Sequence, residues 1–151
     1  MLDMRRATTV VKPGSWRPEQ AAARVTLSFE DRFRRRIQMA DDGGEEFLLD
    51  LAEARRLEDG DGLVLEDGGV ILVQAALEDV LDIACTSRVD ALRIAWYLGN
   101  RHTPVQMLGN GNLRIAYDHV LEQLVEQAGA KAVRRQAPFF PEGGAYESHA
   151  H

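Results

Sequence analysis

Four histidines are the side chains of this sequence best suited to chemistry, and none of them occurs in the first hundred residues. They are His102, His119, His149 and His151. Imidazole nitrogen suits borderline metal ions such as Ni²⁺, Cu²⁺ and Zn²⁺, and histidine-rich tracts such as the His-x-His at 149–151 commonly bind metal. These four residues are therefore the candidate metal ligands.

The positions of two histidines favour a metal ligand over the commoner interpretation, in which a lone histidine is structural. His102, in the stretch "LGNRHTPVQ", follows the expected end of a helix and precedes Pro104, so we expect it to be exposed in a stiff loop. His119 is expected in the first turn of a second helix. There the helix dipole opposes an imidazolium and favours the neutral imidazole that binds metal.

One chain does not supply enough ligands for a closed metal site. Cys85 is the only cysteine and lies in an apolar stretch, where we expect it to be packed rather than reactive. A two-fold axis near His102 would bring two imidazoles together, and His119 or the tail histidines would complete the shell. Such a site is open and exchangeable, which suits carrying a metal better than holding it permanently.

Other chemistries are poorly supported. The turn "DGDG" at 59–62 is not a calcium loop, because Val70 stands where a bidentate glutamate is required. The "GNGN" at 109–112 joins two expected strands and opens no helix, so it is not a dinucleotide fingerprint. Asp118 and His119 are adjacent and no nucleophile elbow is present, which argues against a hydrolase. An enzyme is the least supported class.

The composition is that of a soluble globular protein, with 45% apolar and 28% charged residues among 151. A net charge of −6 argues against a nucleic-acid partner. The one basic cluster, "RFRRR" at 32–36, is better explained as a solvated strand edge. We expect no membrane partner and a cytoplasmic location, because we find no apolar stretch of membrane-spanning length, no signal peptide and no disulfide.

The first half of the chain has the pattern of short strands and tight turns. Val25, Leu27 and Phe29 alternate with polar residues, which indicates a strand with one buried face. Glycines at 43–44 and in the two later acidic turns permit hairpins. The stretch "LAEARRL" at 51–57 predicts one helical turn. We expect a small all-β domain over residues 1–77.

The second half alternates strands and helices. A buried strand is expected at 80–85, followed by a helix capped by Ser87 in which Leu92, Ala95, Trp96 and Gly99 recur at helical spacing, with its C-cap at 99–100. A hairpin around 109–112 leads to a second helix capped by Asp118, with an apolar stripe of Val120, Leu121, Leu124, Val125 and Ala128, and then to a strand at 131–136. The order is βαββαβ, so we predict an α+β protein with a ferredoxin-like domain at 78–138 and a flexible tail at 139–151.

Several of these segments together resemble the UreE family of urease accessory proteins, which are nickel metallochaperones. The segment "LGNRHTPVQ" matches the most recognisable stretch of that family, and "YDHVL" at 117–121 matches a second landmark at a fitting distance. Upstream, an arginine-bearing strand, an acidic-glycine turn and the "GDGL" turn at 60–63 follow in the family's order. The resemblance covers roughly residues 20–140.

The resemblance implies a peptide-binding type of N-terminal β domain, a metal-binding ferredoxin-like domain and a homodimer. It implies that His102 is the principal nickel ligand at the dimer interface and that His119 is a secondary ligand. Some relatives carry another histidine where this chain has Tyr117, and many have tails richer in histidine than one holding only His149 and His151.

The leading hypothesis is a non-catalytic nickel-binding dimer that delivers Ni²⁺ to apo-urease, with the urease accessory GTPase UreG and the urease maturation complex as partners. Cu²⁺ or Zn²⁺ would also bind such ligands. The alternative is an adaptor of the same complex, whose β domain grips a partner while the histidines bind metal incidentally.

Overall fold

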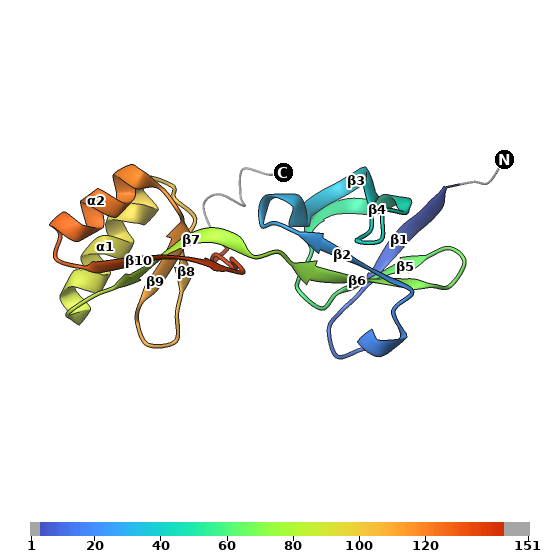
Figure 1. Ribbon diagram of the computed structural model, residues 1–151, viewed down its shortest axis with the longest axis horizontal. Helices are drawn as coiled ribbons and strands as arrows, with labels where there is room; N and C mark the ends of the chain where they lie inside the picture. Colours follow the sequence, from blue (N-terminus) through green and yellow to red (C-terminus); the bar gives the residue numbers. More distant parts are fainter. Residues whose placement is uncertain (1–3, 144–151) are drawn as a thin grey trace. The chain divides into compact units, whose positions relative to one another are not determined.

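The structure is a computed structural model that describes residues 4–143, and the chain divides into two compact units, Met1–Ala76 and Leu77–His151. The first unit is built of strands, and the second combines a sheet with two helices (Figure 1). The predicted α+β class, with a small all-β domain followed by a ferredoxin-like domain, is confirmed. No helix within residues 4–143 has the length and apolar character needed to cross a membrane.

The first unit holds a six-stranded mixed sheet in the order β2-β6-β5-β1-β4-β3. Its strands are β1 (Arg5–Val11), β2 (Ala23–Leu27), β3 (Phe33–Ala40), β4 (Glu46–Arg56), β5 (Gly62–Leu65) and β6 (Val70–Ala75), with short 3₁₀ turns η1 (Pro18–Gln20) and η2 (Glu30–Arg32). Alternate residues of β4, Phe47, Leu49 and Leu51, enter the core. Burying each such side chain contributes about 1.5–3 kcal/mol.

The helical turn predicted at 51–57 is wrong, because residues 51–56 form the second half of β4. Arg55 and Arg56 lie opposite Arg34 and Phe33 of β3 in an antiparallel pair. Leucines at both ends of the segment, Leu51 and Leu57, are buried in the same core. Pairing and burial in the sheet outweigh a local helix preference of a few tenths of a kcal/mol per residue.

The second unit is a four-stranded antiparallel sheet in the order β10-β7-β9-β8, the arrangement of a ferredoxin-like domain. Its elements are β7 (Glu78–Ala84), α1 (Arg88–Asn100), β8 (Gln106–Met107), β9 (Leu113–Ala116), α2 (His119–Gln127) and β10 (Lys131–Ala137). Both helices pack on the face of the sheet that carries Leu81, Ile83 and Ile115, and all three side chains are fully buried.

Both predicted helix starts are confirmed, but the predicted end of the first helix is wrong. The Ser87 hydroxyl accepts a hydrogen bond from the Asp90 amide, and the Asp118 carboxylate accepts one from the Leu121 amide. Gly99 and Asn100, expected to cap α1, are still helical. The left-handed residue that ends α1 lies two positions later and is not a glycine.

The buried face of α1 is also not the one suggested by the spacing of its apolar residues. Ile94 and Leu98 enter the core, whereas Leu92 is 65% exposed and Trp96 70% exposed. Leu92 and Trp96 lie one turn apart and form a ridge on the outer surface of the helix. This unit therefore displays a large aromatic side chain that its own core does not use.

The predicted tail begins too early, because ordered contacts continue to Glu142. Phe139 is only 2% exposed. The Phe140 amide donates to the Gln106 side chain at 3.0 Å, and the Glu142 amide donates to the Val105 carbonyl at 2.8 Å. The buried ring and these hydrogen bonds hold residues 138–142 against the sheet. The rest of the predicted tail, from residue 144, lies outside the described residues.

Candidate metal site

His102 is placed by the way α1 ends. Its backbone has φ 60°, and it is the only residue other than glycine with a positive φ in the described part of the chain. The His102 amide donates to the Gly99 carbonyl at 2.9 Å, and the Thr103 amide donates to the Leu98 carbonyl at 3.0 Å. These two bonds define a Schellman motif with His102 at the position that glycine usually occupies.

A histidine in this conformation is mildly strained. The left-handed region brings the β-carbon close to the backbone and costs roughly 1 kcal/mol for a residue with a side chain. The cost is offset by the two capping hydrogen bonds of the motif, and the imidazole is exposed. The backbone, rather than surrounding side chains, therefore directs His102 away from the domain.

The electrostatic setting of His102 suits a cation. The carbonyl end of a helix carries a partial negative charge that stabilises a nearby cation by roughly 0.3–1 kcal/mol. The neighbouring Arg101 is turned back along the helix, because its Nη1 donates to the Tyr97 hydroxyl at 2.9 Å. The helix end thus favours a positive charge beside the His102 imidazole.

His119 lies in the opposite electrostatic setting. It is the first residue of α2, where the helix dipole is positive, and its side chain is exposed. Its Nε2 lies 3.4 Å from the Nε2 of Gln123, one turn further along the helix. An imidazole here remains accessible to metal, but the helix end opposes the cation. Of the two described histidines, His102 is the better placed.

The structure does not bring the predicted ligands of one chain together. Within residues 4–143, no group of three or more histidine, cysteine, aspartate or glutamate side chains could hold a metal ion. His149 and His151 lie outside the described residues. Burial, and then the charge of Asp90, raise the pKa of the half-buried Cys85 thiol, which disfavours the thiolate that binds metal.

Tyr117 has a structural role. Its hydroxyl donates to the Glu122 carboxylate at 3.1 Å, and this bond is the main reason that the pKa of the Tyr117 hydroxyl is raised. The Arg134 guanidinium stacks on the ring at 3.7 Å, and Asp79 holds the same guanidinium in a two-point ion pair. The tyrosine is thereby fixed between α2 and β10, beside His119 in sequence but not as a metal ligand.

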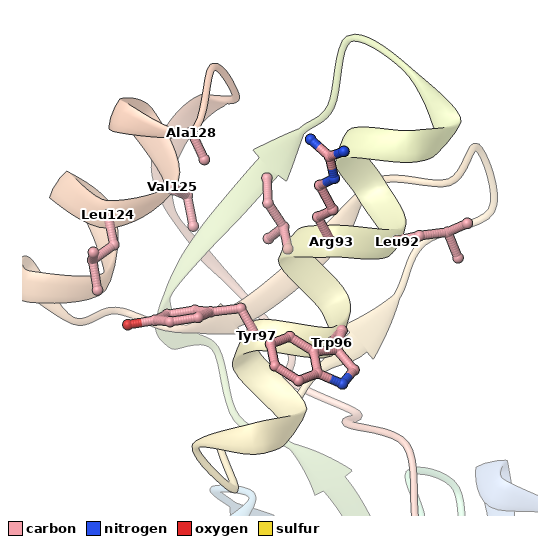
Figure 2. A pocket seen from close by; sticks show the side chains of 8 residues that line it. Leu92, Arg93, Trp96, Tyr97, Leu124, Val125 and Ala128 are labelled. Carbon is pink, nitrogen blue, oxygen red and sulfur yellow. The ribbon is translucent and has the colours of Figure 1, made fainter.

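An apolar groove lies between α1, the helix that ends before His102, and α2 (Figure 2). Its volume is about 580 Å³. Leu92, Trp96 and Tyr97 of α1 line one side, and Leu124, Val125 and Ala128 of α2 line the other. Sequence reasoning missed this surface, because helical spacing identifies the apolar residues of a helix without showing which of them stay outside the core.

Comparison with known proteins matches both units of the chain to models of one family. The family model described as UreE urease accessory protein, N-terminal domain, matches residues 5–76, and the model of the C-terminal domain of the same protein matches residues 78–151. Together they cover both units of the chain.

Individual relatives match over nearly the whole chain. The urease accessory protein UreE of Bradyrhizobium sp. strain ORS 278 is 50% identical over 150 residues, which are 98% of this chain and 70% of the relative. That of Rhodopseudomonas palustris strain BisB18 is 50% identical over 95% of this chain and 67% of the relative. That of Rhodobacter capsulatus is 43% identical over 96% of this chain and 88% of the relative. The chain belongs to the UreE urease accessory protein family.

Proposed function

We propose that two copies of this chain bind Ni²⁺ between them through His102, and that the dimer delivers the ion to apo-urease in the cytoplasm together with the urease accessory GTPase UreG. The observation that carries the proposal is the exposed His102 imidazole, held by a left-handed backbone at the negative end of α1. The protein acts as a carrier and catalyses no reaction of its own.

A second copy of the chain would solve the ligand problem at His102. The described residues of one copy offer no cluster of three ligands, whereas a two-fold axis beside His102 would supply two imidazoles at once. The exposed Leu92 and Trp96 lie on the same helix and give such an interface apolar area. Each side chain buried there would contribute about 1.5–3 kcal/mol.

The tail histidines are the proposed supplementary ligands. The hydrogen bond from the Glu142 amide to the Val105 carbonyl brings the chain to a point three residues from His102 in sequence. His149 follows seven residues after Glu142, a stretch that spans at most about 24 Å when extended. His149 and His151 are therefore within reach of the loop, and His119 serves as a secondary site.

Such a site would exchange its metal readily. Two imidazoles with variable further ligands leave coordination positions open, so a partner protein can begin to bind the ion before the first carrier releases it. Imidazole ligands bind Cu²⁺ at least as well as Ni²⁺, and they also bind Zn²⁺. Nickel selectivity would then come from the partners and from the supply of metal.

Nickel titration of two single variants tests the proposal. We expect His102→Ala to lose the tightest nickel site in isothermal calorimetry, because it removes both of the imidazoles that meet at the two-fold axis of the dimer. The matched control, His119→Ala, also removes one exposed imidazole per chain and should keep that site. The proposal is wrong if His102→Ala retains the tight site and His119→Ala loses it.

A further inference from the structure

The sheet of the second unit has an open face, opposite the face that the two helices cover (Figure 1). Successive residues of a strand point to opposite faces. Leu81 and Ile83 of β7 pack against the helices, so Asp82 between them lies on the open face. Residues 138–142 cross part of this face, and beside them lies a cavity of about 540 Å³.

The cavity has two walls and a floor. The tip of the hairpin between β8 and β9, residues 108–112, forms one wall, and Val133 and Arg135 of β10 form the other. Asp82 and Ala84 of β7 lie in the floor, together with Arg114 of β9. Small-molecule sites in proteins have volumes of roughly 300–1,000 Å³, so a cavity of this size suits a small ligand.

The one acidic residue of the lining, Asp82, is already neutralised. The Nε of Arg114 donates to its Oδ1 at 2.6 Å, and the Nη2 of Arg114 donates to its Oδ2 at 2.9 Å. The remaining nitrogen of this guanidinium, Nη1, donates to the Pro138 carbonyl at 3.2 Å. Arg114 is therefore fully engaged, and its charge is matched by that of Asp82.

Arg135 adds a positive charge that nothing in the lining balances. Its Nε lies 3.3 Å from the same Asp82 oxygen that Arg114 holds. Its side chain is 53% exposed, and its two terminal nitrogens have no acceptor within residues 4–143. These nitrogens form a planar fork of donors that matches the oxygens of an anion. On a chain with net charge −6, the cavity is therefore a local site of positive charge.

The opposite wall presents further donors. The hairpin closes with a hydrogen bond from the Leu108 amide to the Asn112 carbonyl at 2.8 Å. In the described part of the chain, the backbone amides of Gly109 and Asn110 and the side-chain amide of Asn112 have no acceptor. Successive free N–H groups at a turn favour the binding of an anion. Donors thus face the cavity from both walls, without a free carboxylate between them.

We propose that this cavity binds the phosphate group of a small molecule, between the Arg135 fork and the amides of the hairpin. A carboxylate has two oxygens in one plane, and the fork alone would satisfy both. The oxygens of a phosphate are arranged as a tetrahedron, so they can accept hydrogen bonds from both walls at once. The cavity shares no residue with the proposed metal site, so the proposal does not rest on nickel binding.

The test is a titration of the metal-free full chain with inorganic phosphate at constant ionic strength, followed by the amide signals in NMR. We expect saturable shifts at residues 108–112 and 133–135. Arg135→Gln should weaken phosphate binding about tenfold or more, because it removes the charged donors. Asp82 keeps both hydrogen bonds from Arg114 in this variant, so the fold should persist. The control Arg88→Gln makes the same charge change on an exposed residue of α1 and should have no effect.

A second variant tests the other wall. Asn112→Asp has nearly the same shape but replaces a donor with a negative charge, and it should also weaken phosphate binding about tenfold or more. Gln127→Glu makes the equivalent change at the exposed end of α2, outside the cavity, and should bind phosphate normally. Arg135 is unchanged in both of these variants, so the proposal remains testable if Arg135→Gln does not fold.

Two other ligands identify the chemistry of the site. Acetate should bind about tenfold more weakly than phosphate or worse, because its two oxygens reach only one wall. Phenyl phosphate distinguishes the two sources of a phosphate group. Binding at least as tight as that of phosphate would identify a phosphate ester, with its ring on the exposed Val133, and weaker binding would identify the free anion.

Four results would overturn the proposal. They are the absence of saturable shifts, equal binding of acetate and phosphate, unchanged affinity in the folded Arg135→Gln or Asn112→Asp variant, and shifts confined to the arginine-rich strand β3 of the first unit. Repeating the titration with His102→Ala should give the same phosphate affinity, so that a failure of the metal proposal is recognised separately.

Discussion

At the scale of the residue, His102 combines an exposed imidazole with a backbone conformation that favours glycine. Glycine would complete the same Schellman motif without a β-carbon, so the histidine is not needed to end the helix. The two hydrogen bonds of the motif, from the His102 amide to the Gly99 carbonyl and from the Thr103 amide to the Leu98 carbonyl, depend only on the backbone. The side chain is therefore available for binding, and its position is set by the capping motif.

The strain at this residue predicts the order of stability of two variants. The free energy of unfolding of His102→Gly should be about 0.5–1 kcal/mol higher than that of His102→Ala, so the glycine variant should be the more stable. The reason is that alanine keeps the β-carbon that the left-handed region disfavours. Urea denaturation of the metal-free proteins measures the difference, and nickel titration should show that both variants lose the tight site. Equal stabilities would contradict a left-handed residue 102 in solution.

At the scale of the element, side chains outside the helices and strands tie neighbouring segments together. Asp41, in the turn between β3 and β4, accepts hydrogen bonds from the Gly43 and Glu45 amides. It also forms an ion pair with Arg5 of β1. Phe139 acts in the same way after β10, since its buried ring holds the following residues on the sheet. Each residue stabilises the relation between two elements rather than one element alone.

The Asp41 contacts predict a loss of stability in acid. Burial raises the pKa of this carboxyl, but the Arg5 guanidinium and the two backbone amides outweigh that effect, so the pKa lies below its ordinary value of 3.8. Because the pKa of Asp41 is lower in the folded chain than in the unfolded chain, ionised Asp41 stabilises the fold above the unfolded-state pKa. This stabilisation is lost as the pH falls through the folded-state pKa. The free energy of unfolding should be measured between about pH 7 and pH 2 for Asp41→Asn and for the unmodified chain. Below about pH 4 it should fall less steeply in Asp41→Asn. Identical slopes would contradict this role.

The buried ring of Phe139 predicts a large effect for one of two adjacent phenylalanines. Phe139→Ala should lower the free energy of unfolding by about 3–5 kcal/mol, because it leaves a cavity under the segment that follows β10. Phe140, which is 41% exposed, provides the control. Phe140→Ala should cost clearly less in the same urea denaturation. Similar small losses for both would mean that residues 138–142 do not pack as described.

At the scale of the whole molecule, the described residues of one copy do not form a closed metal site. Residues 4–143 hold no metal cluster, and the helix that ends at His102 exposes an apolar ridge beside a groove. Both features have one explanation in the proposed dimer, in which the ridge is covered and two copies of His102 share an ion. A second groove, between β1 and β4, belongs to the other unit.

The proposed dimer predicts that a surface change will weaken nickel binding without touching a ligand. Trp96→Glu should give a monomer in light scattering and lower the nickel affinity at least tenfold, although all four histidines remain. Val133→Glu is the control, because Val133 is also an exposed apolar residue of the second unit but does not line the helix groove. A Trp96→Glu variant that stays dimeric and binds nickel normally would place the interface elsewhere.

Features that depend on neighbours in the chain could be read from the sequence alone. Ser87 and Asp118 begin the two helices as predicted, because a capping side chain bonds an amide only three residues away. The order βαββαβ and its sheet follow from local periodicity and from the few topologies that such an order permits. The two described candidate ligands were likewise identifiable, since His102 and His119 stand at helix ends.

Features that depend on distant partners were decided only by the tertiary structure. Residues 51–56 are a strand because Arg55 and Arg56 pair with β3 and because Leu51 is buried in the core of the sheet. Phe139 is ordered because its ring is buried. Which face of α1 is buried is settled by the sheet beneath it, which takes Ile94 and Leu98 and leaves Trp96 outside. The backbone of His102 follows from where α1 stops: the helix continues through Asn100, so the left-handed position falls on His102, two residues beyond the expected cap. In each case the deciding free energy comes from contacts between residues far apart in sequence, which exceed the local preferences that a sequence displays.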